Sequence, residues 1–213
     1  KTDNTTSSAV TINSTEAVIT NVKDNDSAIG YISLGSLNDT VKALKVGSVE
    51  ATAENVKSGD YVISRPFNIA YKGELSEVAQ DFVDYILSSD GQAVVSGEGY
   101  VAVTENAAYS GKKPEGKISV AGSSSVSPVM QKLKEAYVAV NANAEIEILT
   151  SDSSTGMSNA ASGICDIGMA SRAVKDSEKE KGLTEITIAN DGVAVIVNKE
   201  NPVESMTKSQ VEQ

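Results

Sequence analysis

Apolar residues recur along this chain with two different periods, one typical of helices and one typical of strands. Residues 76–88 give the clearest helix, because their apolar side chains fall three or four positions apart and form one stripe. Residues 28–34 form a short apolar run with the length of a buried strand, and residues 144–150 alternate polar and apolar side chains, which is typical of a strand. Strands and helices alternate in the second half of the chain, which is typical of an α/β fold.

Two long extended runs contain residues that weaken a regular strand. Residues 61–71 carry Pro66, which has no backbone N–H for a β-ladder. We therefore expect a strand that crosses from one sheet to another element and not a central strand. Residues 186–198 form a β-rich run that is broken at Asp191 and Gly192. The polar, turn-rich residues 104–116 are the best candidate boundary in the chain.

Serine-rich turns follow three of the predicted strands. The residues Ser123–Ser125 follow a β-branched strand and precede a helix that starts near Pro128. Ser153 lies in a second such turn, and Ser171 follows the strand at residues 166–170. The ends of parallel strands share one edge of a sheet, so these turns should lie close together. Serine can simply cap a helix, but three clusters at one edge favour a small-anion site made of hydroxyls and helix N-terminal amides.

The composition narrows the class of function. The net charge is −11, which argues against nucleic acid and anionic membrane surfaces as partners. The absence of His removes the Ser–His–Asp triad and His metal sites. The chain also lacks a G-x-S-x-G elbow and an EF-hand spacing, so we expect neither an enzyme nor a metal site, and no cofactor. The single cysteine, Cys165, lies in an apolar run and should be buried in the core.

Three segments of the second half carry a family resemblance. VAGSSSVSPVM, SDSSTGMSNAASGICDIGMASR and ANDGVAVIVNKENP resemble the N-terminal half of the phosphate-binding proteins of phosphate ABC transporters, and residues 13–103 resemble their C-terminal half. That family is of the type II periplasmic binding protein class. The resemblance implies two α/β lobes, each with a mixed, mostly parallel sheet flanked by helices. The two halves stand in reversed order, so the chain resembles a circular permutant or the junction of two tandem copies.

The resemblance also implies a division into lobes. Lobe 1 would be residues 61–190, built from 61–103 and 117–190 with the linker 104–116, and residues 1–60 with 191–213 would supply part of lobe 2. The runs around Pro66 and Gly192 would be the hinge strands. The family's middle segment carries a Gly-Ser-Gly-Thr-type turn and an arginine that bind the anion from the second lobe. No such motif occurs in these 213 residues.

The candidate site residues follow from the same resemblance. Ser124 and Ser125 match the first phosphate-binding turn, and Ser153 matches the serine of the second turn. Ser171 falls where some members carry an aspartate that accepts the proton of phosphate, so selectivity for the protonated anion is weakened there. We expect the neighbouring Arg172 to form a surface ion pair.

We therefore expect a non-catalytic solute-binding protein that captures inorganic phosphate for the permease of a membrane ABC transporter. We expect an extracellular, lipoprotein-type location at the cell surface, or a periplasmic one, because the polar start KTDNTTSS resembles a linker after a membrane anchor. No nucleic acid is expected as a partner. If the chain is the junction of two tandem copies, the remainder of the tandem receptor would be a further partner. The alternatives are a receptor-like scaffold module without ligand, and a receptor for another oxyanion such as sulfate or molybdate.

Overall fold

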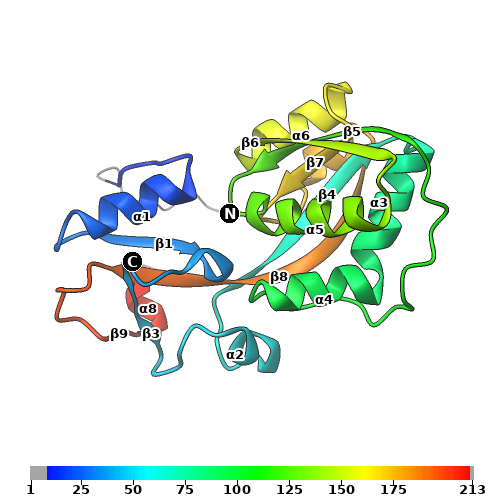
Figure 1. Ribbon diagram of the computed structural model, residues 1–213. Helices are drawn as coiled ribbons and strands as arrows, with labels where there is room; N and C mark the ends of the chain where they lie inside the picture. Colours follow the sequence, from blue (N-terminus) through cyan, green and yellow to red (C-terminus); the bar gives the residue numbers. More distant parts are fainter. Residues whose placement is uncertain (1–8, 212–213) are drawn as a thin grey trace.

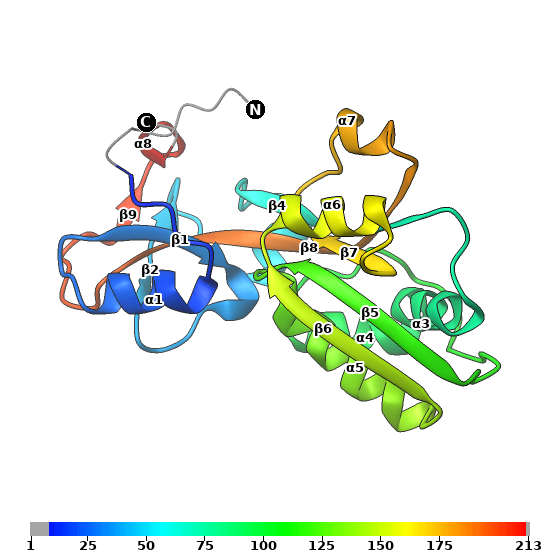
Figure 2. The ribbon, with the colours of Figure 1, turned by 90° about the horizontal axis from the view of Figure 1, so that it is seen from above.

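One long strand, β8 (Leu183–Val197), runs through both parts of the molecule (Figures 1 and 2). The computed structural model describes residues 9–211. Its main sheet has seven strands in the order β1-β8-β4-β7-β5-β6, with β2 also paired to β8, and a second sheet joins β3 to β9. The other strands are β1 (Ile29–Ser33), β2 (Lys42–Ala43), β3 (Lys45–Val46), β4 (Ser64–Lys72), β5 (Gly116–Ser123), β6 (Ala144–Ser151), β7 (Ile167–Ala170) and β9 (Ser205–Met206).

The helices predicted at residues 76–88 and near Pro128 begin within one residue of those positions. The predicted helix at residues 76–88 is α3, and the Ser76 hydroxyl caps it by accepting a hydrogen bond from the Ala79 N–H. None of the helices among residues 9–211 has the length and apolar character needed to cross a bilayer. The helices are α1 (Thr15–Lys23), α2 (Ala53–Ser58), α3 (Glu77–Leu87), α4 (Ser89–Gly97), α5 (Ser127–Val140), α6 (Ser153–Ser162), α7 (Asp176–Lys179) and α8 (Lys208–Val211), with a 3-10 turn η1 (Leu34–Ser36).

The main sheet is mixed, as predicted, but it is not mostly parallel. β5 runs parallel to β6 and to β7, because α5 and α6 cross over the sheet between these consecutive strands. β4 comes from the first half of the chain and inserts between β7 and β8 in the opposite direction, so it is antiparallel to both. β8 is also antiparallel to β1 and β2. The parallel part of the described sheet is therefore confined to the strands that carry the serine turns.

β4 is a central strand, contrary to the expectation drawn from Pro66. The proline pairs with Asn190 of β8, whereas β7 pairs only with residues 68–70 of β4. A register shift between Phe67 and Asn68 separates the two stretches. The missing N–H of Pro66 thus falls outside the part of β4 that pairs on both sides, which is why the sheet tolerates it.

The predicted break in the last long strand is also wrong. β8 continues through Asp191 and Gly192, which pair with Arg65 and Ser64 of β4. Because β4 supplies a partner along this stretch, the polar residue and the glycine do not interrupt the ladder. The two strands together form the connection between the two parts of the molecule (Figure 2).

The larger part of the molecule, which contains β5, β6 and β7, has a hydrophobic layer on each face of its sheet. Helices α3, α4 and α5 cover one face, and α6 covers the other (Figure 2). Phe67, Phe82 and Leu133 are fully buried in the first layer. Cys165 is buried in the second, as predicted, and burial raises the pKa of its thiol to about 11.

The smaller part has two clusters of its own. Ile19 of α1 packs in one of them with Ile32 of β1 and with the far end of β8. The other contains Leu44 and Tyr61, and the Tyr61 hydroxyl donates to the Val193 carbonyl at 2.8 Å. Tyr61, which the predicted division places in lobe 1, therefore packs in the smaller part, and the chain crosses over a few residues later.

Candidate functional site

The three serine turns meet at one end of β5, β6 and β7. The Ser171 N–H donates to the Ser153 Oγ at 3.1 Å, and the two hydroxyl oxygens lie 3.4 Å apart. The Ser124 N–H donates to the Ser151 carbonyl at 2.9 Å, so the first turn adjoins the second. Ser125 is half-buried in the first turn. The sequence predicts Ser153 in a turn before a helix, but Ser153 is the first residue of α6, because Asp152 caps that helix. The structure nevertheless brings all four predicted residues to a single edge of the sheet.

Close backbone approach between these turns depends on Gly122, the residue before the first serine. Its φ is 137°, a value that side-chain-bearing residues rarely adopt. A Cβ on Gly122 would lie 2.3 Å from the Met169 carbonyl oxygen of β7 and 3.1 Å from the Cα of Gly156 in α6. Only glycine lets the strand ends and α6 come this close together.

The serines of the first turn do not cap α5 with their side chains. The N-cap residue of α5 is Val126, which makes no side-chain capping hydrogen bond, and the Ser127 hydroxyl donates back to the Ser123 carbonyl at 3.1 Å. The first-turn N–H groups of α5 therefore have no side-chain cap, and the positive end of its dipole faces the serine turn. The simple capping explanation fails for this turn.

The N-terminus of α6 is different, because a carboxylate already occupies it. The Asp152 carboxylate accepts hydrogen bonds from the N–H groups of Ser154, at 2.8 Å, and Thr155, at 3.0 Å. Hydrogen bonds from the hydroxyl and the N–H of Thr155 hold the pKa of Asp152 below its usual value. α6 therefore offers an anion the hydroxyl of Ser153 beside a fixed negative charge.

Arg65 supplies the positive charge that sequence reasoning missed. Its Nη1 donates to the Ser171 Oγ at 3.4 Å, and its Nε donates to Asp191 at 3.1 Å. The side chain is only 22% exposed. An arginine next to a proline in an extended run gives no local signal of binding. Only the pairing of β4 with β7 places it beside Ser171.

Arg172 forms the ion pair that the sequence predicts. Its two terminal nitrogens donate to both carboxylate oxygens of Glu178, at 2.9 and 2.8 Å. One of them also donates to the Ser154 Oγ at 3.3 Å. Because Glu178 engages the guanidinium in this forked geometry, Arg172 contributes less charge to the serine turns than Arg65 does.

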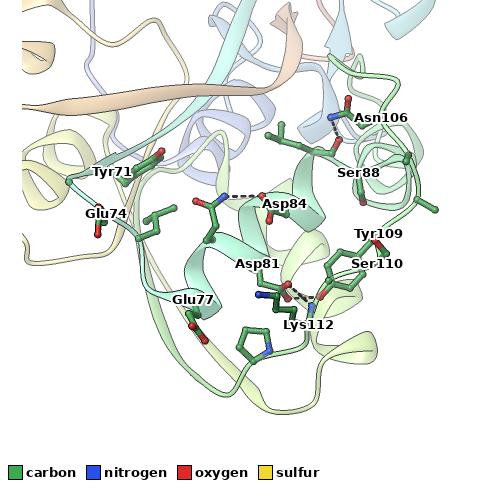
Figure 3. A pocket seen from close by; sticks show the side chains of 18 residues that line it. Tyr71, Glu74, Glu77, Asp81, Asp84, Ser88, Asn106, Tyr109, Ser110 and Lys112 are labelled. Atoms are coloured by element: carbon green, nitrogen blue, oxygen red, sulfur yellow. Dashed lines mark hydrogen bonds between the residues drawn. The ribbon is translucent and has the colours of Figure 1, made fainter.

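A cavity of about 910 Å³ lies at the opposite end of β4, beside α3 and the linker (Figure 3). Its walls carry four carboxylates and one lysine, and none of the predicted serines lines it. The Asp81 carboxylate binds the hydroxyl of Tyr109 and the N–H of Lys112, which fastens the linker to α3. Its acidic walls do not suit an anion. The charged residues are Glu74, Glu77, Asp81, Asp84 and Lys112.

Comparisons with known proteins agree with this architecture. Residues 104–213 match the family model of a PBP superfamily domain. The phosphate-binding protein PstS 2 of Streptococcus agalactiae is 52% identical over 212 residues, which cover 99% of this chain and 72% of that protein. The crystal structure of a phosphate-binding protein of a phosphate ABC transporter from Streptococcus pneumoniae is 43% identical. It gives a TM-score of 0.77 over 98% of this chain and 81% of that chain.

A third relative matches less than half of this chain. The phosphate-binding protein PstS of Staphylococcus saprophyticus is 38% identical, but over only 108 residues, or 47% of this chain. A sequence alignment runs in one direction along both chains, so the streptococcal relative has the two halves in the order found here. The permuted order is thus shared, and no tandem receptor is required to explain it. These relatives are phosphate-binding proteins, one of them of a phosphate ABC transporter, which agrees with the prediction that the chain is not an enzyme. The chain belongs to the PstS family of phosphate-binding proteins, within the PBP superfamily.

Proposed function

We propose that this protein captures inorganic phosphate and delivers it to the permease of a membrane ABC transporter. The anion would bind where the three serine turns meet, with the hydroxyls of Ser124, Ser125, Ser153 and Ser171 and the N–H groups at the start of α5 as donors. The observation that carries this proposal is that the serine turns meet at one edge of the sheet, where the first turn leads into the uncapped N-terminus of α5 and Ser171 contacts Arg65. Helix N-terminal amides and a guanidinium are groups that bind phosphate oxygens well.

We also propose that two lobes close on the anion by a hinge motion. Lobe 1 corresponds to residues 61–190 and lobe 2 to residues 1–60 with 191–213. Separate core clusters on the two sides support this division, with the adjustment that Tyr61 packs on the lobe 2 side. Only β4 and β8 carry the connection among the described strands, and a pair of connecting strands is a suitable hinge. A receptor that serves import would work at the cell surface or in the periplasm.

The fixed charge of Asp152 favours phosphate over sulfate. A carboxylate at an anion site repels a fully ionised anion and accepts a hydrogen bond from a protonated one. Phosphate keeps at least one proton at neutral pH, whereas sulfate has none. Asp152 lies next to Ser153 in the sequence and is held ionised by its hydrogen bonds. It could thus supply the discrimination that Ser171 does not.

Isothermal titration of the full-length protein with phosphate, sulfate and molybdate tests these proposals. We expect heat with phosphate, an affinity about tenfold lower in Ser153→Ala, and an unchanged affinity in Ser119→Ala, whose hydroxyl contacts Asp166 away from the turns. In Asp152→Asn the preference for phosphate over sulfate should shrink. Absence of heat with phosphate would overturn the assignment, and heat with sulfate or molybdate alone would reassign the ligand.

A further inference from the structure

One carboxylate, that of Asp191, holds groups from both lobes. Its side chain is completely buried in β8 at the point where this strand passes between them. On one side its Oδ2 accepts from the Arg65 Nε at 3.1 Å. On the other side its Oδ1 accepts from the Ser33 hydroxyl at 2.8 Å and from the Leu34 N–H at 3.1 Å. Arg65 belongs to β4 beside the serine turns, whereas Ser33 ends β1 and Leu34 begins the turn η1 of the smaller part.

The turn η1 packs tightly against the buried ring of Tyr100, which interacts with the Asp191 carboxylate. A Cβ on Gly35 would lie 2.2 Å from the ring of Tyr100, so the turn rests directly on that buried ring. Arg65 and Tyr100 are the charged and titratable side chains that face Asp191 from the described elements packed around it. Since η1 has little free space against Tyr100 and shares the Asp191 carboxylate with Arg65, we expect a shift of η1 to disturb the hydrogen bond that holds Arg65.

We propose that Asp191 is a positioning residue that directs Arg65 toward Ser171 and ties this orientation to the placement of the smaller lobe through Ser33 and Leu34. The part of this inference that concerns the anion rests on the proposed function, whereas the coupling between the lobes does not. A lobe movement that loosens the contacts of Ser33 and Leu34 also loosens the hold on Arg65. Anion affinity and lobe placement are then linked thermodynamically, each changing the other by the same free energy.

A buried ion pair can also be merely structural, so the test needs more than a stability measurement. Burial raises the pKa of Asp191 to about 6 despite the attraction of Arg65, which puts its titration in an accessible range. The ratio of wild-type to Asp191→Asn phosphate affinity, measured from pH 5 to pH 8, cancels the titration of phosphate itself. A positioning carboxylate makes this ratio depend on pH, because the wild type resembles the variant once it is protonated.

The experiment combines hydrogen exchange without ligand and calorimetric titration with phosphate in the full-length protein. For Asp191→Asn we expect faster exchange at residues 33–36 and 63–65, and an affinity about tenfold lower at pH 8 that approaches the wild-type value near pH 5. For Ser33→Ala we expect faster exchange at residues 33–36 and a smaller loss of affinity. The control Glu178→Gln, which removes the partner of Arg172, should leave exchange at these residues unchanged.

Two results would overturn the inference. If exchange at residues 33–36 stays unchanged in Asp191→Asn, the carboxylate does not couple the lobes. If the affinity ratio is the same at every pH, the ionised carboxylate does not position Arg65. Should Asp191→Asn fail to fold, Ser33→Ala decides the coupling by the same exchange measurement. If the wild type binds no phosphate, the proposed function fails, and the exchange data still decide the coupling.

Discussion

The hydroxyl oxygens of Thr15 and Ser124 lie 3.4 Å apart, although 109 positions separate the two residues. Thr15 begins α1, which packs in the smaller part, and Ser124 lies in the first serine turn of the larger part. This contact brings the capped N-terminus of α1, in the smaller part, to the serine turn of the larger part. The proposed anion site is therefore bordered by residues from both parts of the molecule.

Replacing Arg65 should weaken phosphate binding more than replacing Arg172. We expect Arg65→Gln to lower the affinity at least about tenfold, because it removes the guanidinium beside Ser171. Arg172→Gln is the matched control, since Glu178 already engages that guanidinium on both terminal nitrogens. Calorimetric titration at neutral pH measures both variants, and thermal melts verify that they fold. Equal losses in the two variants would contradict the role of Arg65.

Gly122→Ala should destabilise the protein strongly. The new methyl group would meet the Met169 carbonyl at 2.3 Å, and that oxygen belongs to a backbone that cannot move aside without breaking the sheet. We expect a loss of about 3 kcal/mol or more in the free energy of unfolding. Gly163→Ala is the control, because Gly163 has a φ of 71° but open space around it, so only backbone strain of about 1 kcal/mol applies. Urea unfolding compares the two, and similar losses would refute the close contact.

The stability of the protein should depend on pH through Asp191. Its pKa is raised from 3.8 to about 6, so between these pH values the folded protein binds a proton that the unfolded chain has lost. The contribution is fully present below pH 3.8 and is lost as the pH rises through 6. At 1.36 kcal/mol for each pKa unit, the free energy of unfolding of the wild type should fall by up to about 3 kcal/mol over this range.

Denaturant unfolding of the wild type and Asp191→Asn from pH 4 to pH 7 measures this dependence. As the pH rises, the free energy of unfolding of the wild type should fall relative to that of Asp191→Asn. Parallel curves for the two proteins would show that Asp191 keeps an ordinary pKa in the folded state.

Asp81→Asn should release the linker. The Asp81 carboxylate accepts hydrogen bonds from the hydroxyls of Tyr109 and Tyr137 and from the Lys112 N–H. Loss of the charge should destabilise the protein by about 1–3 kcal/mol and speed proteolysis between residues 104 and 115. Asp84→Asn is the matched control, because the exposed Asp84 accepts only from Gln80 among the contacts that the structure gives it. Limited proteolysis would argue against this fastening if both variants were cleaved at the wild-type rate.

Local patterns in the sequence predicted much of the fold. The apolar stripe of α3 and the strand–serine–helix repeats appear directly in the structure, because they depend on neighbouring residues. Motifs of a few residues also carried the family resemblance and the reversed order of its halves. The same local reasoning misjudged Pro66 and Gly192, because whether a strand tolerates them depends on which strand pairs there. The four serines are brought to one edge, and their role as ligands stays a prediction.

By itself, the sequence determined most of the secondary elements, the family and the order of the two halves, since each of these depends on residues that are close together in the sequence. Only the tertiary structure decided that Arg65 lies beside Ser171 and that Asp191 joins it to Ser33. The sequence separations are 106 positions between Arg65 and Ser171 and 158 between Ser33 and Asp191. Contacts over such separations arise from the order and register of strands, which a local pattern does not encode.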